Sequence, residues 1–439
     1  MIGDEVVAFN CANQLIVVWN STASELWRLM AKNKTQEDLE QYLINNYELS
    51  RSGANRDANI FLDETSRFGF CGDHEQVMPI STVTQEDGVN TLLTVEMHAI
   101  EKQIPFAVTF ETTYSCNLNC IHCYMDRDLP SLSTNEICRI LEEISEEGCL
   151  FLSLTGGEFF TRKDWPVIID KASQLHFAID ILSNGTLINQ EVVQVLMGKP
   201  IRRLQISLYG SSPETHDAIT RVPGSFNTSI NAINLLVNTG FKVEISCPLM
   251  NINFHERYKA KQLAENMGCL LLLSHLITAH NNGSKHTHCL RLDGLQLTDF
   301  LSDTNLIKLY GGRRPFQDHQ YYIGFTDLMD ATPCYSGINS CAISPIGKVL
   351  PCNQLLYRVG DLRVDSFATI WRDSPQLLYL RGLTLRDLHS CKECRLLPNC
   401  SRCPGLALLE NNDLLGISPE NCRVAKIQAS LEKGGNKNL

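Results

Sequence analysis

The sequence predicts an α/β protein with a partial (β/α)6 TIM-type barrel at its centre. Three observations lead to this fold class. Six β-rich runs alternate with helical patterns between residues 106 and 277, which is typical of a parallel sheet. Residues 1–70 combine short strands with three helices, as in a small winged-helix-like α+β domain. The last part of the chain, residues 331–425, is rich in cysteine.

The composition is that of a globular protein of 439 residues, 44% hydrophobic and 20% charged. At about 150 residues per domain, this length suggests roughly three domains. The formal net charge of −11 disfavours a nucleic acid as partner, because polyanion-binding proteins usually carry the opposite sign. The sequence contains neither an apolar run of about 18 residues nor a signal peptide. We therefore expect a cytoplasmic protein that does not bind a membrane.

Residues 1–70 form the first expected unit. Apolar residues recur there first at strand spacing and then at helical spacing. The expected elements are strands at 6–9 and 15–19, and helices from a capping box at 22–25, from about residue 35, and at about 56–67. The mixed, polar segment 71–105 is interpreted as a linker.

The barrel segment, residues 106–277, follows. Parallel strands present their carboxyl ends at one edge of the sheet, where active sites of such folds lie. Three close cysteines follow the first strand, a glycine pair the second, and Ser183-Asn184-Gly185 the third, so we expect a site at this edge. The expected strands are 106–112, 150–154, 178–182, 203–208, 242–248 and 270–277, with helices at 134–147 and 231–239 among others.

Residues 278–330 are expected to bridge the barrel and the cysteine-rich region. Their histidines stand among Asn, Gly and Ser residues, so we interpret them as solvated side chains rather than metal ligands. These histidines are His280, His286, His288 and His319. After the cysteine-rich region, residues 426–439 are expected to form a frayed tail.

The 18 cysteines are unevenly distributed. A reducing cytosol disfavours disulfides, so clustered cysteines indicate metal ligands. A lone cysteine is usually a small buried hydrophobic residue. This is the interpretation for Cys11, Cys71, Cys138, Cys149, Cys247, Cys269 and Cys289. The first cluster, Cys116-x3-Cys120-x2-Cys123, supplies three thiolates. A structural zinc site requires four protein ligands. Three thiolates on a [4Fe–4S] cluster instead leave one iron without a protein ligand.

With the glycine pair and the Ser-Asn-Gly turn, residues 106–275 resemble the radical S-adenosylmethionine (SAM) enzymes, whose signature loop is C-x3-C-x2-C. The resemblance implies a [4Fe–4S] cluster on these three cysteines. Its open iron binds SAM, and SAM is then cleaved to a 5′-deoxyadenosyl radical that abstracts hydrogen from the substrate. The SAM contacts that it implies are His122, where an aromatic residue is commoner, Gly156, Gly157, Glu158, Ser183, Asn184, Ser207 and Arg221. The alternative is a structural metal loop on an unrelated α/β domain.

Eight cysteines between residues 334 and 422 resemble the SPASM extension of the same superfamily, which binds two auxiliary [4Fe–4S] clusters. By the family pattern, auxiliary cluster I takes Cys334, Cys341, Cys352 and Cys403, and auxiliary cluster II takes Cys391, Cys394, Cys400 and Cys422. Two residues separate Cys400 from Cys403 where the family usually has three, which leaves the ligand assignment open. Auxiliary clusters with four cysteine ligands each have no open iron for a substrate, so an electron-relay or structural role is expected for them. The alternative is a zinc ribbon on Cys391, Cys394, Cys400 and Cys403.

Residues 6–70 resemble the RiPP recognition element, a domain that binds the leader of a ribosomally made peptide as an added strand packed against its third helix. The family's first strand is expected either to be missing or to lie upstream of residue 1. A DNA-binding winged helix is the rival interpretation. Residues 1–70 hold ten acidic and six basic residues, and this charge disfavours DNA because binding requires neutralised phosphates.

Together, the resemblances imply a radical SAM/SPASM enzyme that modifies a precursor peptide whose leader is bound by residues 1–70. An electron donor such as flavodoxin or ferredoxin is implied. A thioether from a peptide Cys to carbon is the expected product, and a carbon–carbon crosslink is next; epimerisation would need a cysteine hydrogen donor that the sequence does not identify. A radical SAM/SPASM dehydrogenase or maturase for a protein side chain or small molecule is the alternative, and an iron–sulfur winged-helix regulator is the remote one.

Overall fold

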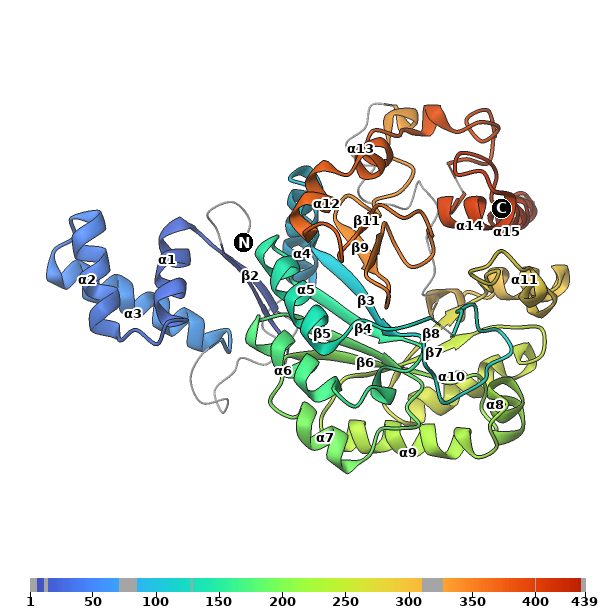
Figure 1. Ribbon diagram of the computed structural model, residues 1–439, viewed down its shortest axis with the longest axis horizontal. Helices are drawn as coiled ribbons and strands as arrows, with labels where there is room; N and C mark the ends of the chain where they lie inside the picture. The colour runs from blue at the N-terminus through green and yellow to red at the C-terminus, as the bar shows by residue number, and fades with distance from the viewer. Residues whose placement is uncertain are drawn as a thin grey trace. The chain divides into compact units, whose positions relative to one another are not determined.

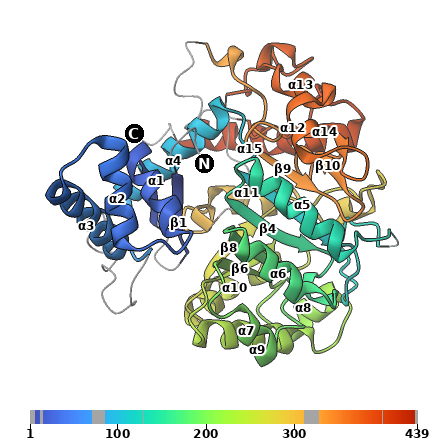
Figure 2. The same cartoon turned by 60° about the vertical axis from the view of Figure 1, so that its left-hand side comes forward.

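The computed structural model describes residues 6–11, 15–70, 85–127, 129–309, 327–398 and 400–435. The chain divides into two compact units, Met1–Gln103 and Ile104–Leu439 (Figures 1 and 2). Two residues with a predicted role, Cys71 and His319, lie outside the described residues. Among the described residues, no helix combines the length and the apolar character needed to cross a membrane.

The first unit is a two-stranded antiparallel sheet with four helices. Trp19 lies at the centre of its core, with the rings of Trp27, Phe61 and Phe70 within 6.1 Å of the Trp19 ring. The elements are β1 (Val6–Asn10), β2 (Leu15–Trp19), α1 (Ser21–Met30), α2 (Gln36–Tyr47), α3 (Arg51–Arg67) and α4 (Gln85–Glu101). The two strands therefore lie where the sequence predicts them.

Three helix positions in this unit differ from expectation. The capping box expected at 22–25 is wrong, because Asn20 caps α1 and its side chain accepts a hydrogen bond from the Ala23 amide. Helix α3 begins at Arg51, since Ser50 caps it. The segment interpreted as a linker carries α4, which packs against β2 and buries Val95 and Ala99, four residues apart on one helix face.

The second unit contains a nine-stranded sheet in the order β11-β10-β9-β3-β4-β5-β6-β7-β8. Strands β3 to β8 run parallel in chain order and alternate with helices, which confirms the predicted partial barrel (Figure 1). They are β3 (Ala107–Thr113), β4 (Phe151–Gly156), β5 (Ala178–Ser183), β6 (Ile201–Ser207), β7 (Val243–Pro248) and β8 (Leu270–Ser274). Apolar side chains on the outer face of this sheet pack against the helices in one large core.

Helices of this unit cover the outside of the sheet, and further helices follow the barrel in the chain (Figures 1 and 2). Those of the barrel are α5 (Thr134–Glu146), α6 (Trp165–Gln174), α7 (Gln190–Leu196), α8 (Pro213–Thr220), α9 (Ser225–Asn238) and α10 (Arg257–Asn266). Those that follow are α11 (Gly294–Ser302), α12 (Phe367–Asp373), α13 (Pro375–Arg381), α14 (Pro404–Asn411) and α15 (Pro419–Gly435). Because α15 continues to Gly435, most of the expected tail is helical.

The cysteine-rich region extends the barrel sheet. Its strands are β9 (Ser340–Ile343), β10 (Lys348–Leu350) and β11 (Gly360–Asp361), and β9 pairs in parallel with β3. Of the lone cysteines, Cys149, Cys247 and Cys269 are buried, whereas Cys11 and Cys138 are half-buried. The expectation of burial is wrong for Cys289, which lies exposed in a short turn of the bridging segment.

Candidate active site

A cavity of about 460 Å³ lies where strands β3 to β8 end. The chain folds this way because each strand is followed by a loop that turns back over the sheet edge, so residues distant in sequence meet there. Two wall residues, Asn353 and Gln354, come from the cysteine-rich region. The predicted site residues on the wall are Cys116, Cys120, Cys123, His122, Gly156, Gly157, Ser183, Asn184 and Ser207.

The three thiols of the first cluster lie together in the loop after β3. Burial, and next the neighbouring thiols Cys116 and Cys123, raise the pKa of Cys120 to about 12. Burial also raises the pKa of Cys116, whose sulfur accepts from the Leu118 amide at 3.4 Å. Thiols that raise one another's pKa hold their protons until a metal binds and displaces them. This donor set therefore fits an iron–sulfur cluster with three thiolate ligands.

Arg127 is the cation of this loop, and its position was not predicted. Its guanidinium lies on the cavity wall and donates to the Leu118 carbonyl and to Cys123. Burial lowers the pKa of Arg127, but the hydrogen bond to Cys123 and the charges of the other thiolates more than offset this. The side chain thus remains cationic and stabilises negative charge on the three sulfurs.

The glycine pair at the end of β4, Gly156 and Gly157, lets the cluster loop lie directly against the strand end. A Cβ on Gly156 would lie 2.0 Å from the Thr113 carbonyl oxygen, and one on Gly157 would lie 2.4 Å from that of Ser115. Gly156 also has a φ of 143°, which side chains disfavour. The Gly157 amide donates to the Thr113 carbonyl at 2.7 Å. The pair therefore holds the cluster loop in place as well as lining the cavity.

Glu158, a predicted SAM contact, lies buried behind the cavity wall. Its carboxylate accepts from Ser183 Oγ at 2.9 Å, from the Asn184 amide at 2.7 Å and from the Phe160 amide at 3.1 Å. Burial raises the pKa of Glu158, and these hydrogen bonds oppose that shift. Glu158 thus fixes the turn after β5 and so positions Ser183 and Asn184, which line the cavity.

Aromatic side chains close one side of the cavity. The His122 ring lies 4.7 Å from the ring of Tyr209, which follows Ser207 at the end of β6. Burial lowers the pKa of His122 to about 4, so this imidazole is neutral at neutral pH. Tyr209 hydrogen-bonds with Ser207 and Cys120. Tyr209 lies two residues after the predicted contact Ser207 but was not itself predicted as a site residue.

Arg221, like Glu158, is a predicted SAM contact that does not line the cavity. It is the exposed left-handed residue that ends α8, with a φ of 58°. Asn353 and Gln354 line the cavity without having been predicted. Their only sequence signal was their position directly after Cys352.

The second cysteine field separates into two groups. Burial, followed by the neighbouring thiol Cys422, raises the pKa of Cys400 to about 12, and Cys391 and Cys394 contribute to this shift. Burial and the thiols Cys334 and Cys403 raise the pKa of Cys352 to about 12. Because Cys403 belongs with Cys352 rather than with Cys400, the arrangement disfavours the zinc ribbon. Of the set expected for auxiliary cluster I, Cys341 lies in β9 within the main core, and Cys352 packs against the same core.

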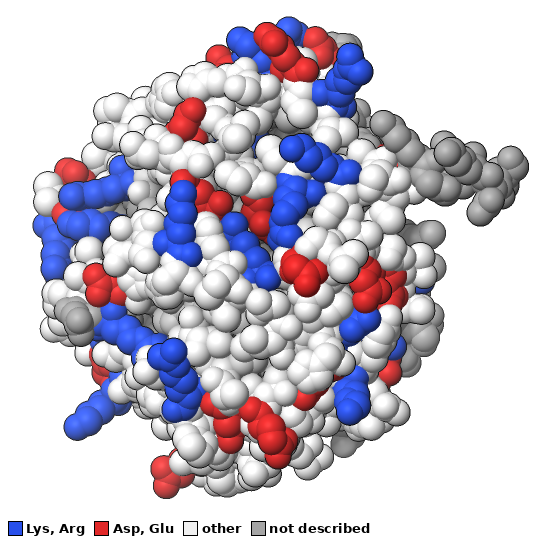
Figure 3. Space-filling view, turned by 90° about the vertical axis from the view of Figure 1, so that its right-hand side faces the viewer, with Lys and Arg blue, Asp and Glu red and all other residues white. Residues whose placement is uncertain are grey.

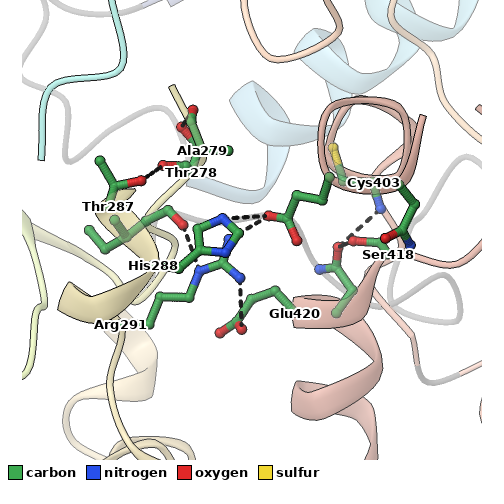
Figure 4. Close-up of polar contacts among 12 residues, drawn as sticks. Thr278, Ala279, Thr287, His288, Arg291, Cys403, Ser418 and Glu420 are labelled. Carbon is green, nitrogen blue, oxygen red and sulfur yellow. Dashed lines mark hydrogen bonds and ion pairs between the residues drawn. The ribbon is translucent and has the colours of Figure 1, made fainter. Parts of the chain in front are cut away.

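A buried ion cluster connects the bridging segment to α14, which directly follows Cys403, and to α15, which contains Cys422 (Figure 4). Arg291 donates to Glu410 on α14 and lies 3.6 Å from Glu420 on α15, and His288 Nε2 lies 3.6 Å from Glu410. Nearby, the Asn421 side chain accepts from the Cys403 amide at 3.2 Å. The expectation of solvated histidines is therefore wrong for His288. This cluster fixes Cys403 and Cys422 through their helices.

Replacing Arg291 by methionine is expected to lower the free energy of unfolding by about 3 kcal/mol, because it leaves a buried carboxylate without its main cation. The side chains of Glu410 and Glu420 are only 2% and 3% exposed, while Glu420 keeps its pair with Arg423. Denaturant unfolding measures the change. Arg386→Met is the matched control, since its partners Asp327 and Asp330 are about half exposed; equal losses in both variants would contradict the proposed role of burial.

Two sequence families match the second unit. Residues 110–264 match the radical SAM superfamily. Residues 334–404 match the SPASM iron–sulfur cluster-binding domain. The chain is a radical SAM protein with a SPASM domain. The radical SAM domain binds a [4Fe–4S] cluster and SAM, and the SPASM domain binds auxiliary iron–sulfur clusters.

Individual relatives of this radical SAM protein agree with that assignment. The AdoMet-dependent heme synthase of Methanosarcina barkeri is 25% identical over 337 residues, covering 72% of this chain and 95% of that protein. The mycofactocin maturase MftC of Mycobacterium ulcerans is 26% identical over 334 residues, covering 72% and 87%. The structure of Streptococcus suis SuiB bound to its precursor peptide SuiA has a TM-score of 0.62 at 15% identity, covering 95% and 98%. The shared fold confirms the predicted radical SAM barrel.

Charged side chains on the face of the radical SAM protein seen in Figure 3 are mixed in sign. Among its described residues, Lys and Arg stand between Asp and Glu rather than forming one continuous basic surface. Duplex binding depends on neutralising consecutive phosphates. This face therefore gives no support to a nucleic-acid partner.

Proposed function

We propose that this radical SAM/SPASM enzyme modifies a ribosomally synthesised precursor peptide. Two features together support this proposal: the cavity of about 460 Å³ at the three thiols, and a separate first unit of sheet and helices. A small substrate needs only the cavity, whereas a peptide with a leader needs a second docking unit. Support comes from MftC, named as a maturase, and from SuiB, whose fold likeness extends over 95% of this chain and whose structure contains a precursor peptide.

The cavity residues divide the work as follows. Cys116, Cys120 and Cys123 hold the cluster, and when bound, cluster and SAM supply a 5′-deoxyadenosyl radical that abstracts hydrogen from the substrate. The glycine pair keeps the cluster loop against β4, while Ser183, Asn184 and Ser207 offer hydrogen bonds to SAM. The neutral His122 ring can accept or donate a hydrogen bond at the adenine of SAM. Glu158 acts through the Ser183-Asn184 turn, and Arg221 remains a prediction for the SAM carboxylate.

The expected product is a thioether from a peptide Cys to carbon, or else a carbon–carbon crosslink. Joining an S–H and a C–H group removes two protons and two electrons, of which one hydrogen atom leaves with the abstracting radical. The other proton goes to solvent, and the other electron requires an acceptor. The auxiliary sites at Cys352 and Cys400 provide a path for that electron, and a flavodoxin- or ferredoxin-like protein is the proposed partner that reduces the enzyme.

A small-molecule substrate is the second candidate, and the similarity to heme synthase favours it. Co-expression of the enzyme with a short peptide encoded beside its gene separates the two. Tandem mass spectrometry should show a peptide lighter by two hydrogens at each new bond, with fragments that locate the bond. An unchanged peptide, together with turnover of a small molecule, would favour the second candidate.

A further inference from the structure

Part of the cavity wall is not used by the predicted SAM contacts. It is formed by the segment after β8 and by the turn after β10, and its side chains are all neutral. These residues are Leu276, Ile277, Thr278, Asn353 and Gln354. Among the described wall residues, Arg127 is the one Lys, Arg, Asp or Glu, and its guanidinium is bound to the cluster loop. A ligand on this part of the wall therefore meets hydrogen-bonding and apolar groups without a counter-ion.

Tyr124 holds both segments of this wall in place. Its carbonyl accepts from the Asn281 amide of the bridging segment at 2.8 Å. Its phenol hydrogen-bonds with the side chain of Asn353 in the turn after β10. Because Tyr124 directly follows Cys123, the loop that holds the cluster also positions the wall beyond it. This part of the wall is thus preorganised for a ligand.

Gln354 is fixed through its main chain, which leaves its side chain available. A Cβ on Gly405 would lie 2.4 Å from the Gln354 carbonyl oxygen, so α14 packs directly against the main chain of this turn. The next residue, Leu355, is buried in the main core. The Asn353 side chain is engaged with Tyr124, whereas the side chain of the half-buried Gln354 has no hydrogen-bond partner among the described residues. A fixed turn therefore presents a free carboxamide at the cavity.

We propose that Gln354 is a specificity-determining residue that hydrogen-bonds with the main chain of the substrate peptide beside the reacting carbon. A carboxamide donates through its NH2 group and accepts through its oxygen, so it complements the C=O and N–H groups of a peptide. The neutral wall suits a segment without ionised side chains, because an ion there would lose water without gaining a counter-ion. A small molecule that carries carboxylates would find no cation on this part of the wall. The assignment rests on the proposed peptide function.

Kinetics with the peptide encoded beside the gene test this role. Gln354→Leu should lower kcat/KM for peptide modification about tenfold, because a peptide group in the cavity loses its hydrogen-bond partner. The loss should appear mainly in KM, as for a contact that is equally strong in the ground state and the transition state. Gln194→Leu, at an exposed position of α7, is the matched control and should keep the full value. Equal kcat/KM in the two variants would overturn the proposal.

Ester analogues of the peptide test the same contact in the unchanged enzyme. The peptide linkages on the two sides of the modified residue are replaced in turn by esters, which removes an N–H donor and weakens a carbonyl acceptor. At one linkage the wild-type enzyme should lose about fivefold in kcat/KM, and Gln354→Leu should lose nothing further there, since the contact is already absent. The proposal is overturned if the wild type loses activity at neither linkage, or if Gln354→Leu loses as much as the wild type at each. Failure of the proposed function appears separately, as an unaltered peptide that the wild-type enzyme does not modify, and would overturn both.

Discussion

Replacing Cys116, Cys120 and Cys123 together by alanine is expected to abolish SAM cleavage. The same change should lower bound iron from about twelve to about eight atoms per chain, since the two auxiliary sites keep their own thiols. The physical reason is that, among the described cysteines, these three are the ones that line the cavity at the ends of β3 to β8. The three cysteines line the cavity, and Cys400 and Cys352 belong to separate thiol groups.

The measurement pairs iron analysis with chromatography of 5′-deoxyadenosine after reduction by dithionite. Cys289→Ala is the matched control, because Cys289 is exposed and lies outside the three thiol groups. It should retain both the full iron content and the full rate. Formation of 5′-deoxyadenosine by the triple variant at the rate of the control would contradict the assignment of the cluster loop.

The barrel and the cluster loop were predictable because their signals are local. Each barrel strand is an apolar run ended by a turn, and the cysteine spacing fits one short loop. The position of β9 was not predictable, since its four residues are too few to show a period and its partner β3 lies more than 200 residues earlier. A count of cysteines could not show that Cys341 would face the core. Strand register decides which face of the sheet a cysteine side chain takes, and composition gives no information on register.

Polar residues show the same limit. The Gly156-Gly157-Glu158 motif was found by its spacing, but the burial of Glu158 beneath the turn after β5 follows from tertiary packing. The cluster around Arg291 joins residues more than 100 positions apart. Such contacts produce no periodic pattern in the sequence. Neither the burial of Glu158 nor the ion cluster around Arg291 could therefore be predicted.

Removing Met1–Gln103 is expected to uncouple peptide processing from SAM chemistry. The cut falls after α4, because that helix packs within the first unit. The truncated enzyme keeps the cavity and should form 5′-deoxyadenosine, while its affinity for the leader should fall at least tenfold, or about 1.4 kcal/mol. Fluorescence anisotropy with a labelled leader peptide measures the binding. Unchanged binding and modification by the truncated enzyme would contradict the recognition role of this unit.

A single substitution at the outer edge of β2 tests the same role in the full chain. The Val6 amide donates to Ser24 Oγ at 2.8 Å rather than to its partner Trp19. Alternate pairs of an antiparallel ladder share this orientation, so the Val17 amide, two residues before Trp19, points away from β1, toward the edge where we expect an added strand to pair. Trp19 itself is unsuitable for a proline test, since its ring forms the core of the unit.

Val17→Pro removes that donor and is tolerated best at an edge. It should weaken leader binding about fivefold, the loss of one hydrogen bond of about 1 kcal/mol. Val17→Ala keeps the amide and is the control that separates the main-chain bond from the side chain. Because strand addition draws its affinity from main-chain hydrogen bonds, only the proline variant should lose binding. Equal losses in both variants would assign recognition to the Val17 side chain, and no loss in either would place the leader elsewhere.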